Sequence, residues 1–586
     1  MSLKCLLHIL FTISSFYLFS AHASSVISCI SNLTINISLY INCSETTSAL
    51  TIPNEDSNVT KLVIVNATNS IPSNLCKLKS LKVLHFEMNH LSDLRTANFS
   101  CLKNLYHLYL VNNSIQYINK NTFSGLIQLQ SLSLSYNQIT HIDSEVFENL
   151  TSLSDLSFTG NNLTEIKENF LVHAKIVSIY LQHNSIIEIH MNAFKYMKSL
   201  IRIYLSVNKI NELKNNTFSN LKNLEILHLS GNNISKFNSY AFHNLSRLKN
   251  LSFMSNQLTK LENKIFMNLS SLEILDLSRN RIEVIEEEAF FNLHNLKLIY
   301  IEKNFIKDIH INYLNSLNLV DLSSNNITEI QDDLFKNLKN LTMLYLDNNS
   351  IENISARAFN DLNSLNLLSL SNNKIIEIPK NLFHSHLSNL EIILLNNNKL
   401  TKMELWPFYL PKIRKIDLSD NSIEQFSNEH KWFYFNESLK DLSSDIKIHL
   451  KSNNSILLND STIQQYGICN SNDFKEFFSK FFKFFYTDPI SIECSCPKNL
   501  ISDLSHLLKE NSSLRHINNT LCSNGLSIVN LTCSELTKLE NVYYCTTTTT
   551  TVTTTVHEIT TKEKDTMENG LKHIANTRAT QSILMI

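Results

Sequence analysis

The side chains in this chain that could carry chemistry are tyrosines and histidines, and they recur at one fixed position. Tyr180, Tyr204 and His228 follow one another at steps of 24 residues, and Arg202 lies two residues before Tyr204. A phenol ring brings a large contact area at low entropic cost, with a hydroxyl that can orient a partner. The chemistry that these residue types favour is recognition of a partner molecule.

Signatures of catalysis are missing from the sequence. It has no G-x-S-x-G, no H-E-x-x-H and, with six glycines in 586 residues, no phosphate-binding glycine loop. The 21 histidines are scattered and not clustered at ligand spacing. We therefore expect no enzyme, no cofactor and no metal site. A formal net charge of −2 without a basic tract argues against a nucleic-acid partner.

A repeated asparagine identifies the elements that must position these side chains. It stands in the frame L-x-x-L-x-L-x-x-N-x-L, mostly every 24 residues, at Asn89, Asn113, Asn137, Asn161, Asn184, Asn208, Asn232, Asn256, Asn280, Asn304, Asn325, Asn349, Asn373, Asn398 and Asn421. The L-x-L core alternates as a short strand does, and one copy cannot bury its leucines alone. The copies must stack into a parallel sheet. We expect each asparagine side chain to bond backbone groups of its own turn and of the next coil.

A phenylalanine column follows ten residues after the asparagines. Its members are Phe99, Phe123, Phe147, Phe170, Phe194, Phe218, Phe242, Phe266, Phe290, Phe335, Phe359, Phe383 and Phe408, with Tyr313 in one short repeat. Because a stacked core requires one such residue per repeat, we interpret the column as an aromatic spine of the core, and not as a ligand site.

The combined pattern resembles the 24-residue "typical" class of extracellular leucine-rich repeats, over residues 59–426. It is similar to Toll-receptor ectodomains and to Slit-like and other secreted or cell-surface proteins of this kind. The resemblance implies an α/β repeat solenoid, a leucine-rich-repeat horseshoe of about 15–16 repeats with a concave parallel β-sheet and disulfide-bonded terminal caps. It also implies extracellular protein–protein recognition, without naming the partner.

On the concave sheet, outward side chains lie six, four and two positions before each asparagine. We expect these positions to be exposed and to hold the protein-binding residues, which are Tyr109, Tyr180, Arg202, Tyr204, His228, Tyr300 and Tyr345. Tyr180, Tyr204, His228 and Arg202 form the favoured patch, and His107 with Tyr109 a second. Aromatic residues also suit strands, so a purely structural role stays open.

The N-terminus predicts secretion. Residues 1–23 combine Lys4, an apolar run and an A-x-A cleavage pattern, which is typical of a signal peptide; a membrane anchor is the alternative. No later segment has 18 apolar residues in a row, so we expect no transmembrane helix. Sequons are dense, and the expected N-glycosylation sites include Asn112, Asn149, Asn162, Asn233, Asn250, Asn326 and Asn348. The sequence leaves a homodimer and attachment to a cell surface through a partner open.

Ten cysteines outside the signal peptide fit an oxidised framework. They are Cys29, Cys43, Cys76, Cys101, Cys469, Cys494, Cys496, Cys522, Cys533 and Cys545. Cys76 and Cys101, in consecutive repeats, are close enough to pair, with free thiols as the alternative. The others fall in an N-terminal cap at 24–58 and in a degenerate last repeat and Cys-rich C-terminal cap at 427–545, where the pairing is left open.

Two segments near the C-terminus have their own patterns. Phenylalanines from Phe474 to Phe485 recur at helical spacing, which predicts a helix that covers the open end of the core or docks on a membrane or partner. The Thr-rich residues 546–586 read as a disordered tail.

Together the sequence predicts a secreted binding protein for cell adhesion, ligand capture or receptor modulation, with an extracellular protein or glycoconjugate as ligand. A soluble innate-immune pattern-recognition protein and a structural component of the extracellular matrix are the alternatives.

Overall fold

A computed structural model describes residues 30–34, 38–42, 59–66, 70–72, 74–94, 99–143, 145–171, 175–332, 334–379, 382–383, 387–403, 410, 412–423, 425–426, 447–450 and 485–487. These residues belong to two compact units. The first unit runs to Leu258 and includes Lys264–Leu272, and the second unit contains Thr259–Asn263 and continues from Glu273.

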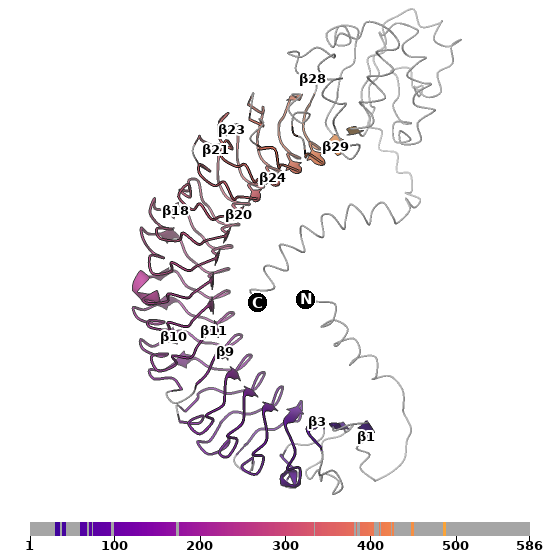
Figure 1. Cartoon of the computed structure of the whole chain (residues 1–586), viewed down its shortest axis with the longest axis vertical. Coiled ribbons are helices and arrows are strands. Elements are labelled where there is room, and N and C mark those ends of the chain that lie inside the picture. The colour runs from indigo at the N-terminus through magenta and orange to yellow at the C-terminus, as the bar shows by residue number, and fades with distance from the viewer. Residues whose placement is uncertain are drawn as a thin grey trace, which may run out of the picture. The chain divides into compact units, whose positions relative to one another are not determined.

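The first unit is a stack of short parallel strands (Figure 1). They are β3 (Lys61–Val65), β4 (Val83–Glu87), β5 (His107–Tyr109), β6 (Ser131–Ser133), β7 (Asp155–Ser157), β9 (Ser178–Tyr180), β11 (Arg202–Tyr204), β13 (Ile226–His228) and β15 (Asn250–Ser252). An antiparallel hairpin of β1 (Ile30–Thr34) and β2 (Ser38–Asn42) pairs with β3 at the start of this sheet. Equivalent repeat positions lie opposite each other, as Leu108 does to Leu132.

The second unit repeats this arrangement. Its main strands are β17 (Ile274–Asp276), β19 (Leu298–Tyr300), β20 (Leu319–Asp321), β22 (Met343–Tyr345), β24 (Leu367–Ser369), β25 (Ile392–Leu394), β27 (Lys415–Asp417), β29 (Lys447–Leu450) and β30 (Phe485–Thr487). The last two pair in parallel with each other, and β29 pairs with β27. The predicted phenylalanine helix therefore does not reach Phe485, which begins a strand; Phe474 to Phe482 lie outside the described residues.

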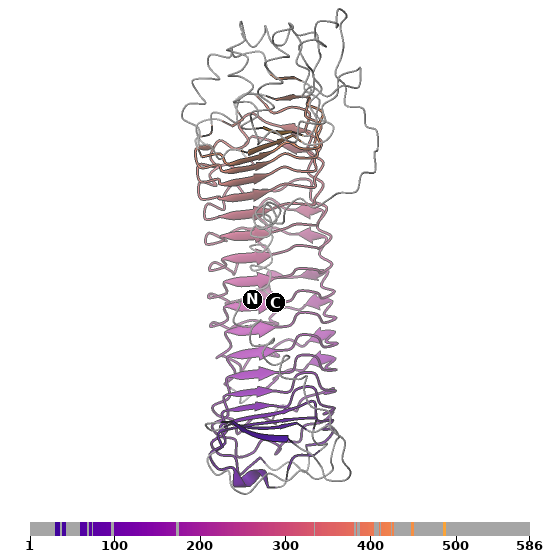
Figure 2. The same ribbon diagram turned by 90° about the vertical axis from the view of Figure 1, so that its right-hand side faces the viewer.

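Short two-stranded sheets form where some of the described coils return (Figure 2). In the first unit they pair β8 (Glu165–Ile166) with β10 (Glu188–Ile189) and β12 (Glu212–Leu213) with β14 (Lys236–Phe237). In the second unit they pair β16 (Lys260–Leu261) with β18 (Val284–Ile285), β21 (Glu329–Ile330) with β23 (Asn353–Ile354), and β26 (Lys402–Met403) with β28 (Gln425–Phe426).

Helix is nearly absent from the described part of the chain, which has two 3-10 segments, η1 (Leu75–Lys77) and η2 (Ser239–Phe242). The prediction of a leucine-rich-repeat solenoid with a parallel sheet is confirmed. The α component of the expected α/β class is reduced to these segments, because turns and short strands make the other connections.

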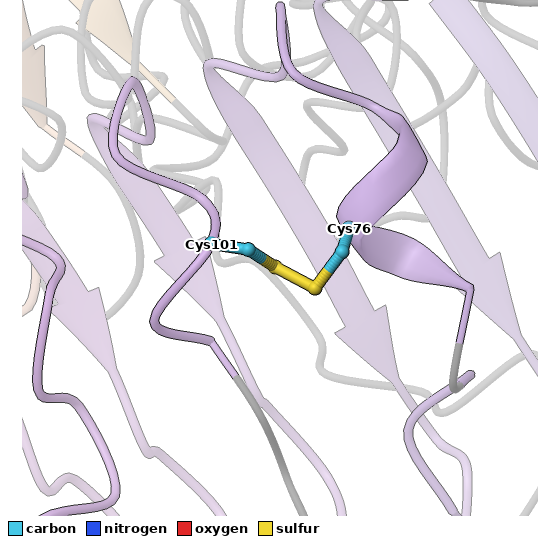
Figure 3. Close-up of a disulfide and its surroundings, with 2 residues drawn as sticks. All are labelled: Cys76 and Cys101. Carbon is cyan, nitrogen blue, oxygen red and sulfur yellow. A yellow bond between two sulfur atoms is a disulfide. The ribbon is translucent and has the colours of Figure 1, made fainter.

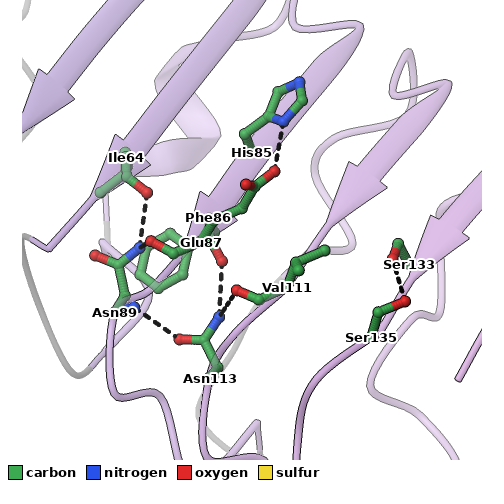
Figure 4. Close-up of polar contacts among 9 residues, drawn as sticks. All are labelled: Ile64, His85, Phe86, Glu87, Asn89, Val111, Asn113, Ser133 and Ser135. Atoms are coloured by element: carbon green, nitrogen blue, oxygen red, sulfur yellow. Dashed lines mark hydrogen bonds and ion pairs between the residues drawn. The ribbon is translucent and has the colours of Figure 1, made fainter. Parts of the chain in front are cut away.

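The asparagine ladder joins each coil to its neighbour (Figure 4). The Asn113 Nδ2 donates to the carbonyl oxygen of Phe86 at 2.8 Å and to that of Val111 at 3.2 Å. Its Oδ1 accepts from the N–H of Leu91 at 3.1 Å. The same pattern reaches Asn421 at the far end. The coil that each side chain reaches is the preceding one, not the next one as expected from the sequence, and the bonds satisfy buried backbone groups that water cannot reach.

The aromatic spine lies inside the core. Its buried members are Phe99, Phe123, Phe147, Phe170, Phe194, Phe218, Phe242, Phe266, Phe290, Phe335, Phe359 and Phe383. Neighbours contact each other ring to ring, with centroids 5.7 Å apart for Phe194 and Phe218. Phe408 lies outside the described residues, and Tyr313 is half-buried with its hydroxyl donating to the Glu287 carbonyl. Each ring removes apolar surface from water, and the column holds the return side of successive coils together.

A disulfide staples the first coils of the first unit (Figure 3). Cys76 and Cys101 are bonded with their Cα atoms 5.4 Å apart, across a separation of 25 residues. This is one repeat, so the bond fixes the register of two consecutive coils. The other eight predicted disulfide cysteines lie outside the described residues.

Candidate functional site

The tyrosines of the first unit form a candidate binding surface on the outward face of its sheet. Strand register places Tyr180 of β9 opposite Tyr204 of β11, and Tyr204 opposite His228 of β13. The two phenol rings stack with centroids 4.9 Å apart and planes 5° from parallel. The His228 ring meets Tyr204 edge-on at 5.1 Å. We call these three residues and Arg202 the Tyr180 patch.

The members of the Tyr180 patch differ in their solvent exposure. Tyr180, Arg202 and Tyr204 are half-buried and remain accessible to a partner. His228 is 1% exposed, so it does not present a surface as the sequence led us to expect. Neither of its ring nitrogens has a hydrogen-bond partner among the described residues. Burial lowers the pKa of His228 to about 4, so the ring is neutral at pH 7 and supports Tyr204 as an aromatic wall.

Arg202 supplies the charge of the patch. Its Nη1 donates to the Ser178 Oγ at 3.3 Å, which orients the guanidinium across the sheet. The remaining N–H groups of a guanidinium can bond a carboxylate or carbonyl of a partner. Burial raises the pKa of Tyr204, Tyr180 raises it further and Arg202 opposes the shift. The Tyr204 hydroxyl therefore stays protonated at neutral pH and can donate a hydrogen bond.

Tyr109 belongs to a separate aromatic cluster, three strands away from Tyr180. Its ring stacks on His85 of β4 with centroids 4.5 Å apart and planes 19° from parallel. His107, on the same strand as Tyr109, lies 6.3 Å from it. The His85 Nδ1 contacts the Glu87 Oε1 at 2.7 Å, a contact visible in Figure 4. This carboxylate fixes the rotation of the histidine ring under the tyrosine.

The two predicted tyrosines of the second unit are not exposed. Tyr300 and Tyr345 are 7% and 5% exposed. Their outward neighbours on the same strands are Leu298 and Met343, and the Tyr345 hydroxyl lies 3.8 Å from the Met343 sulfur. Burial, and then the neighbouring carboxylates of Asp276 and Asp321, raise the pKa of Tyr300 strongly. These tyrosines are packed beside aliphatic side chains and, in their own column, beside the buried Asp276 and Asp321, so they present little surface to a partner.

Sequence reasoning missed a chain of hydroxyl groups between Tyr109 and Tyr180. The Ser133 Oγ lies 3.0 Å from that of Ser135, which lies 2.7 Å from that of Ser157. The Ser157 Oγ lies 3.2 Å from the Thr159 Oγ1, which donates to the Gln182 Oε1 at 3.2 Å. The signal was present in the outward positions, where serine and threonine replace tyrosine over two repeats.

Most of the asparagines predicted to be glycosylated are exposed. Exposed sequon asparagines are Asn112, Asn149, Asn162, Asn233, Asn326 and Asn348. Asn250 differs because it is half-buried on β15, opposite Ile226 of β13. A glycan on Asn250 would lie on the outward face, one strand from His228.

Among the described residues, no three or more His, Cys, Asp and Glu side chains are grouped so that they could hold a metal ion. In the same part of the chain, no helix has the length and apolar character needed to cross a membrane.

Comparison with known families identifies the repeat. A family model described as leucine rich repeat matches residues 79–139, 103–163, 127–173 and 315–375. A second, described as BspA type leucine rich repeat region, matches residues 187–318 and 354–487. No curated protein matches the chain at a significant level.

Solved structures with similar folds come from several organisms. A leucine-rich-repeat protein of Leptospira interrogans is 25% identical, with a TM-score of 0.51, over 67% of this chain and 92% of its own. An internalin of Listeria monocytogenes is 25% identical, with a TM-score of 0.43, over 54% and 87%. The Toll–Spatzle complex of Drosophila gives 21% identity and a TM-score of 0.49 over 76% and 56%. The Leptospira protein supports the same solenoid fold.

Proposed function

Because the chain belongs to the leucine-rich-repeat proteins, we propose that it is a secreted, N-glycosylated protein that recognises another extracellular protein through the Tyr180 patch. The observation that carries the proposal is the pair of stacked, half-exposed tyrosines with Arg202 beside them. Tyrosine and arginine are the residue types that most often dominate the energy of protein interfaces. Their attachment to consecutive strands holds them in place before a partner arrives, which lowers the entropic cost of binding.

The alternative outward surface of the second unit is less suited to this role. Its tyrosines are buried, and a side chain that is already covered cannot contribute contact area to a partner. The partner should present an apolar or aromatic group to the two phenol rings and an acceptor to Arg202. This combination favours a folded protein surface with a carboxylate or exposed carbonyl near its centre.

The proposed secretion and N-glycosylation rest on features of the sequence. The signal peptide directs the chain to the secretory pathway, and the exposed sequon asparagines are positioned for modification. Expression in a eukaryotic cell line should yield protein in the medium whose mass falls on treatment with peptide N-glycosidase. Retention in the cytosol at the mass of the bare chain would refute this part of the proposal.

The binding site is tested by capture on intact cells. Secreted protein carrying a proximity-labelling enzyme should label a specific surface protein, and a Tyr180→Ala/Tyr204→Ala double variant should label it at least tenfold less. The matched control replaces Tyr117 and Tyr240, which are each 60% exposed and lie outside the Tyr180 patch. Equal labelling by the patch variant and the control would place the interface elsewhere.

Asn250 offers a second test of the same face. If its glycan is attached, it stands close to the patch on the same sheet, so Asn250→Gln should leave labelling unchanged or increase it. A loss of labelling in Asn250→Gln, with normal secretion, would show that this side chain or its glycan takes part in the contact.

A further inference from the structure

The structure points to a second site on the first unit, which we propose binds a neutral oligosaccharide between Tyr109 and Tyr180. It goes beyond the protein partner proposed above and does not depend on it. Four residues follow one another across β5, β6, β7 and β9, namely Tyr109, Ser133, Ser157 and Tyr180. Three strand steps of about 4.8 Å separate the two tyrosines by about 14 Å.

The two tyrosine rings are oriented so that each directs one face into the space between them. Tyr109 stacks one face on His85 and Tyr180 stacks one face on Tyr204, with centroids at strand spacing and planes nearly parallel. Rings stacked in this way stand upright on the sheet with their faces directed along the row of strands. The second faces of Tyr109 and Tyr180 are therefore directed toward each other, above the two serines.

Small side chains lie between the rings. Ser133 and Ser157 are half-buried and much shorter than a tyrosine, so they cannot reach the height of the rings. We call Ser133, Ser135, Ser157 and Thr159 the serine floor. Figure 4 shows the contact between Ser133, the last residue of β6, and Ser135, two residues further on.

The serine floor is chemically suited to hydroxyl groups. Each Ser or Thr hydroxyl has one donor and two acceptor positions, and the chain of contacts from Ser133 to Gln182 aligns them in one network. Such networks polarise their members and strengthen further hydrogen bonds. A ligand hydroxyl could join the network as donor or acceptor without leaving a protein group unpaired.

Charge is nearly absent from the surface around the floor. One side chain is charged among the outward positions of β6, β7 and β9 and the two residues that follow each of these strands. It is Asp155, whose carboxylate accepts a hydrogen bond from the Ser154 Oγ at 2.6 Å. Arg202 reaches the edge of this surface from β11, where it donates to the Ser178 Oγ, and these outward positions themselves carry no cation. A pyranose combines an apolar C–H face, which packs on an aromatic ring, with hydroxyls at its rim.

The span has room for one pyranose on each ring. If each tyrosine takes one pyranose at an ordinary aromatic contact of about 4.5 Å, about 5 Å remains between the two sugar rings. The rings would hold the apolar sugar faces, and the serine floor would bond the hydroxyls that are directed toward the sheet.

The test is calorimetric titration of the secreted full-length protein with chitotetraose, cellotetraose, maltotetraose and mannotetraose. We expect at least one to bind with a Kd below about 1 mM. Ser157→Leu, which fills the space between the rings from the outward face, should weaken binding at least tenfold, and so should Tyr109→Ala. The control Ser206→Leu changes a half-buried serine two residues beyond β11 and should stay within twofold of the original protein.

The outcomes separate this site from the Tyr180 patch. Arg202→Ala should reduce labelling of the protein partner and leave sugar binding unchanged. Ser157→Leu should weaken sugar binding and leave labelling of the protein partner unchanged. Circular dichroism checks that Ser157→Leu and Tyr109→Ala keep the fold. Failure of all four sugars at 10 mM, or equal sugar binding by Ser157→Leu and the original protein, would overturn the proposal whatever the protein partner does.

Discussion

The same repeat position has opposite exposure in the two units. Four residues before the ladder asparagine, the first unit carries half-buried Tyr109, Tyr180 and Tyr204, whereas the second unit carries buried Tyr300 and Tyr345. The strands have the same length and register in both units. The difference must therefore come from the outward side chains around the tyrosines.

The flanking outward column differs in chemistry between the units. Six residues before the asparagine, the second unit has only aliphatic residues over six strands, namely Ile274, Leu298, Leu319, Met343, Leu367 and Ile392. In the first unit the tyrosines of β5, β9 and β11 have His107, Ser178 and Arg202 at this position. The aliphatic residues of this flanking column cover the rings of the second unit on one side and exclude water. Asp276 and Asp321, directly opposite Tyr300, are buried together with it. The position in the repeat thus predicts that a side chain is directed outward, and the surrounding side chains determine whether it is exposed.

The largest test of this comparison is truncation of one tyrosine in each unit. Tyr300→Ala should lower the free energy of unfolding by about 3–5 kcal/mol, because it leaves a cavity in a packed layer. Tyr180→Ala should cost about 1 kcal/mol or less, since its ring is partly in water already. Urea unfolding followed by circular dichroism measures both. If the two variants lost the same free energy of unfolding, the buried Tyr300 would stabilise the fold no more than the half-buried Tyr180.

Much of the fold could be predicted from the sequence, because repetition constrains it. Each asparagine and each phenylalanine is repeated many times, and one stacking arrangement satisfies all of them. The direction of the ladder could not be predicted, since an amide can bond either neighbouring coil equally well. The near absence of α-helix in the described connections also escaped prediction, because short apolar segments between strands suit turns and helices alike.

The candidate site was predicted less well, and for a physical reason. Periodicity assigns a side chain to the outward face but does not measure how its neighbours cover it. His228, Tyr300 and Tyr345 were correctly assigned to outward strand positions, and they are buried by what surrounds them. The serine floor was overlooked because serine has no strong preference on its own, and its meaning depends on the two tyrosines on either side.

His228 provides the next test, because it is the buried exception within the first unit. Its pKa in the folded protein is about 4, below the ordinary value of 6.5. Above pH 6.5 the ring is neutral in both states. As the pH falls from 6.5 toward 4, the unfolded chain binds a proton that the folded chain does not, so stability is lost. Between pH 7.5 and 5 this amounts to about 2 kcal/mol.

The measurement compares urea unfolding at pH 7.5 and pH 5 in the original protein and in His228→Phe. The variant should lose less stability on acidification, by roughly the amount given above. His141→Phe, at an exposed histidine of the same unit, should behave as the original protein does. An unchanged pH dependence in His228→Phe would mean that this ring is protonated in the folded state, and that the Tyr180 patch is more open than its burial indicates.

The asparagine ladder should contribute equally to the stability of both units, so it gives the smallest expected difference in the free energy of unfolding. Asn137 in the first unit donates to the Leu110 and Leu134 carbonyls and accepts from the Ile115 N–H. Asn325 in the second unit makes the equivalent three contacts. Asn137→Leu and Asn325→Leu should each cost roughly 1–3 kcal/mol, because each leaves the same buried backbone groups without partners.

The two costs should agree within about 0.5 kcal/mol when unfolding is measured under identical conditions. Asn121→Leu, at an exposed asparagine outside any sequon, is the control for altered solubility. Agreement would locate the difference between the units in their outward columns, where binding is proposed. A clearly larger cost for Asn325→Leu would mean that the second unit is also packed more tightly around its ladder. The burial of Tyr300 would then follow from the whole coil, and replacing Leu298 or Met343 by serine would not be enough to open that face.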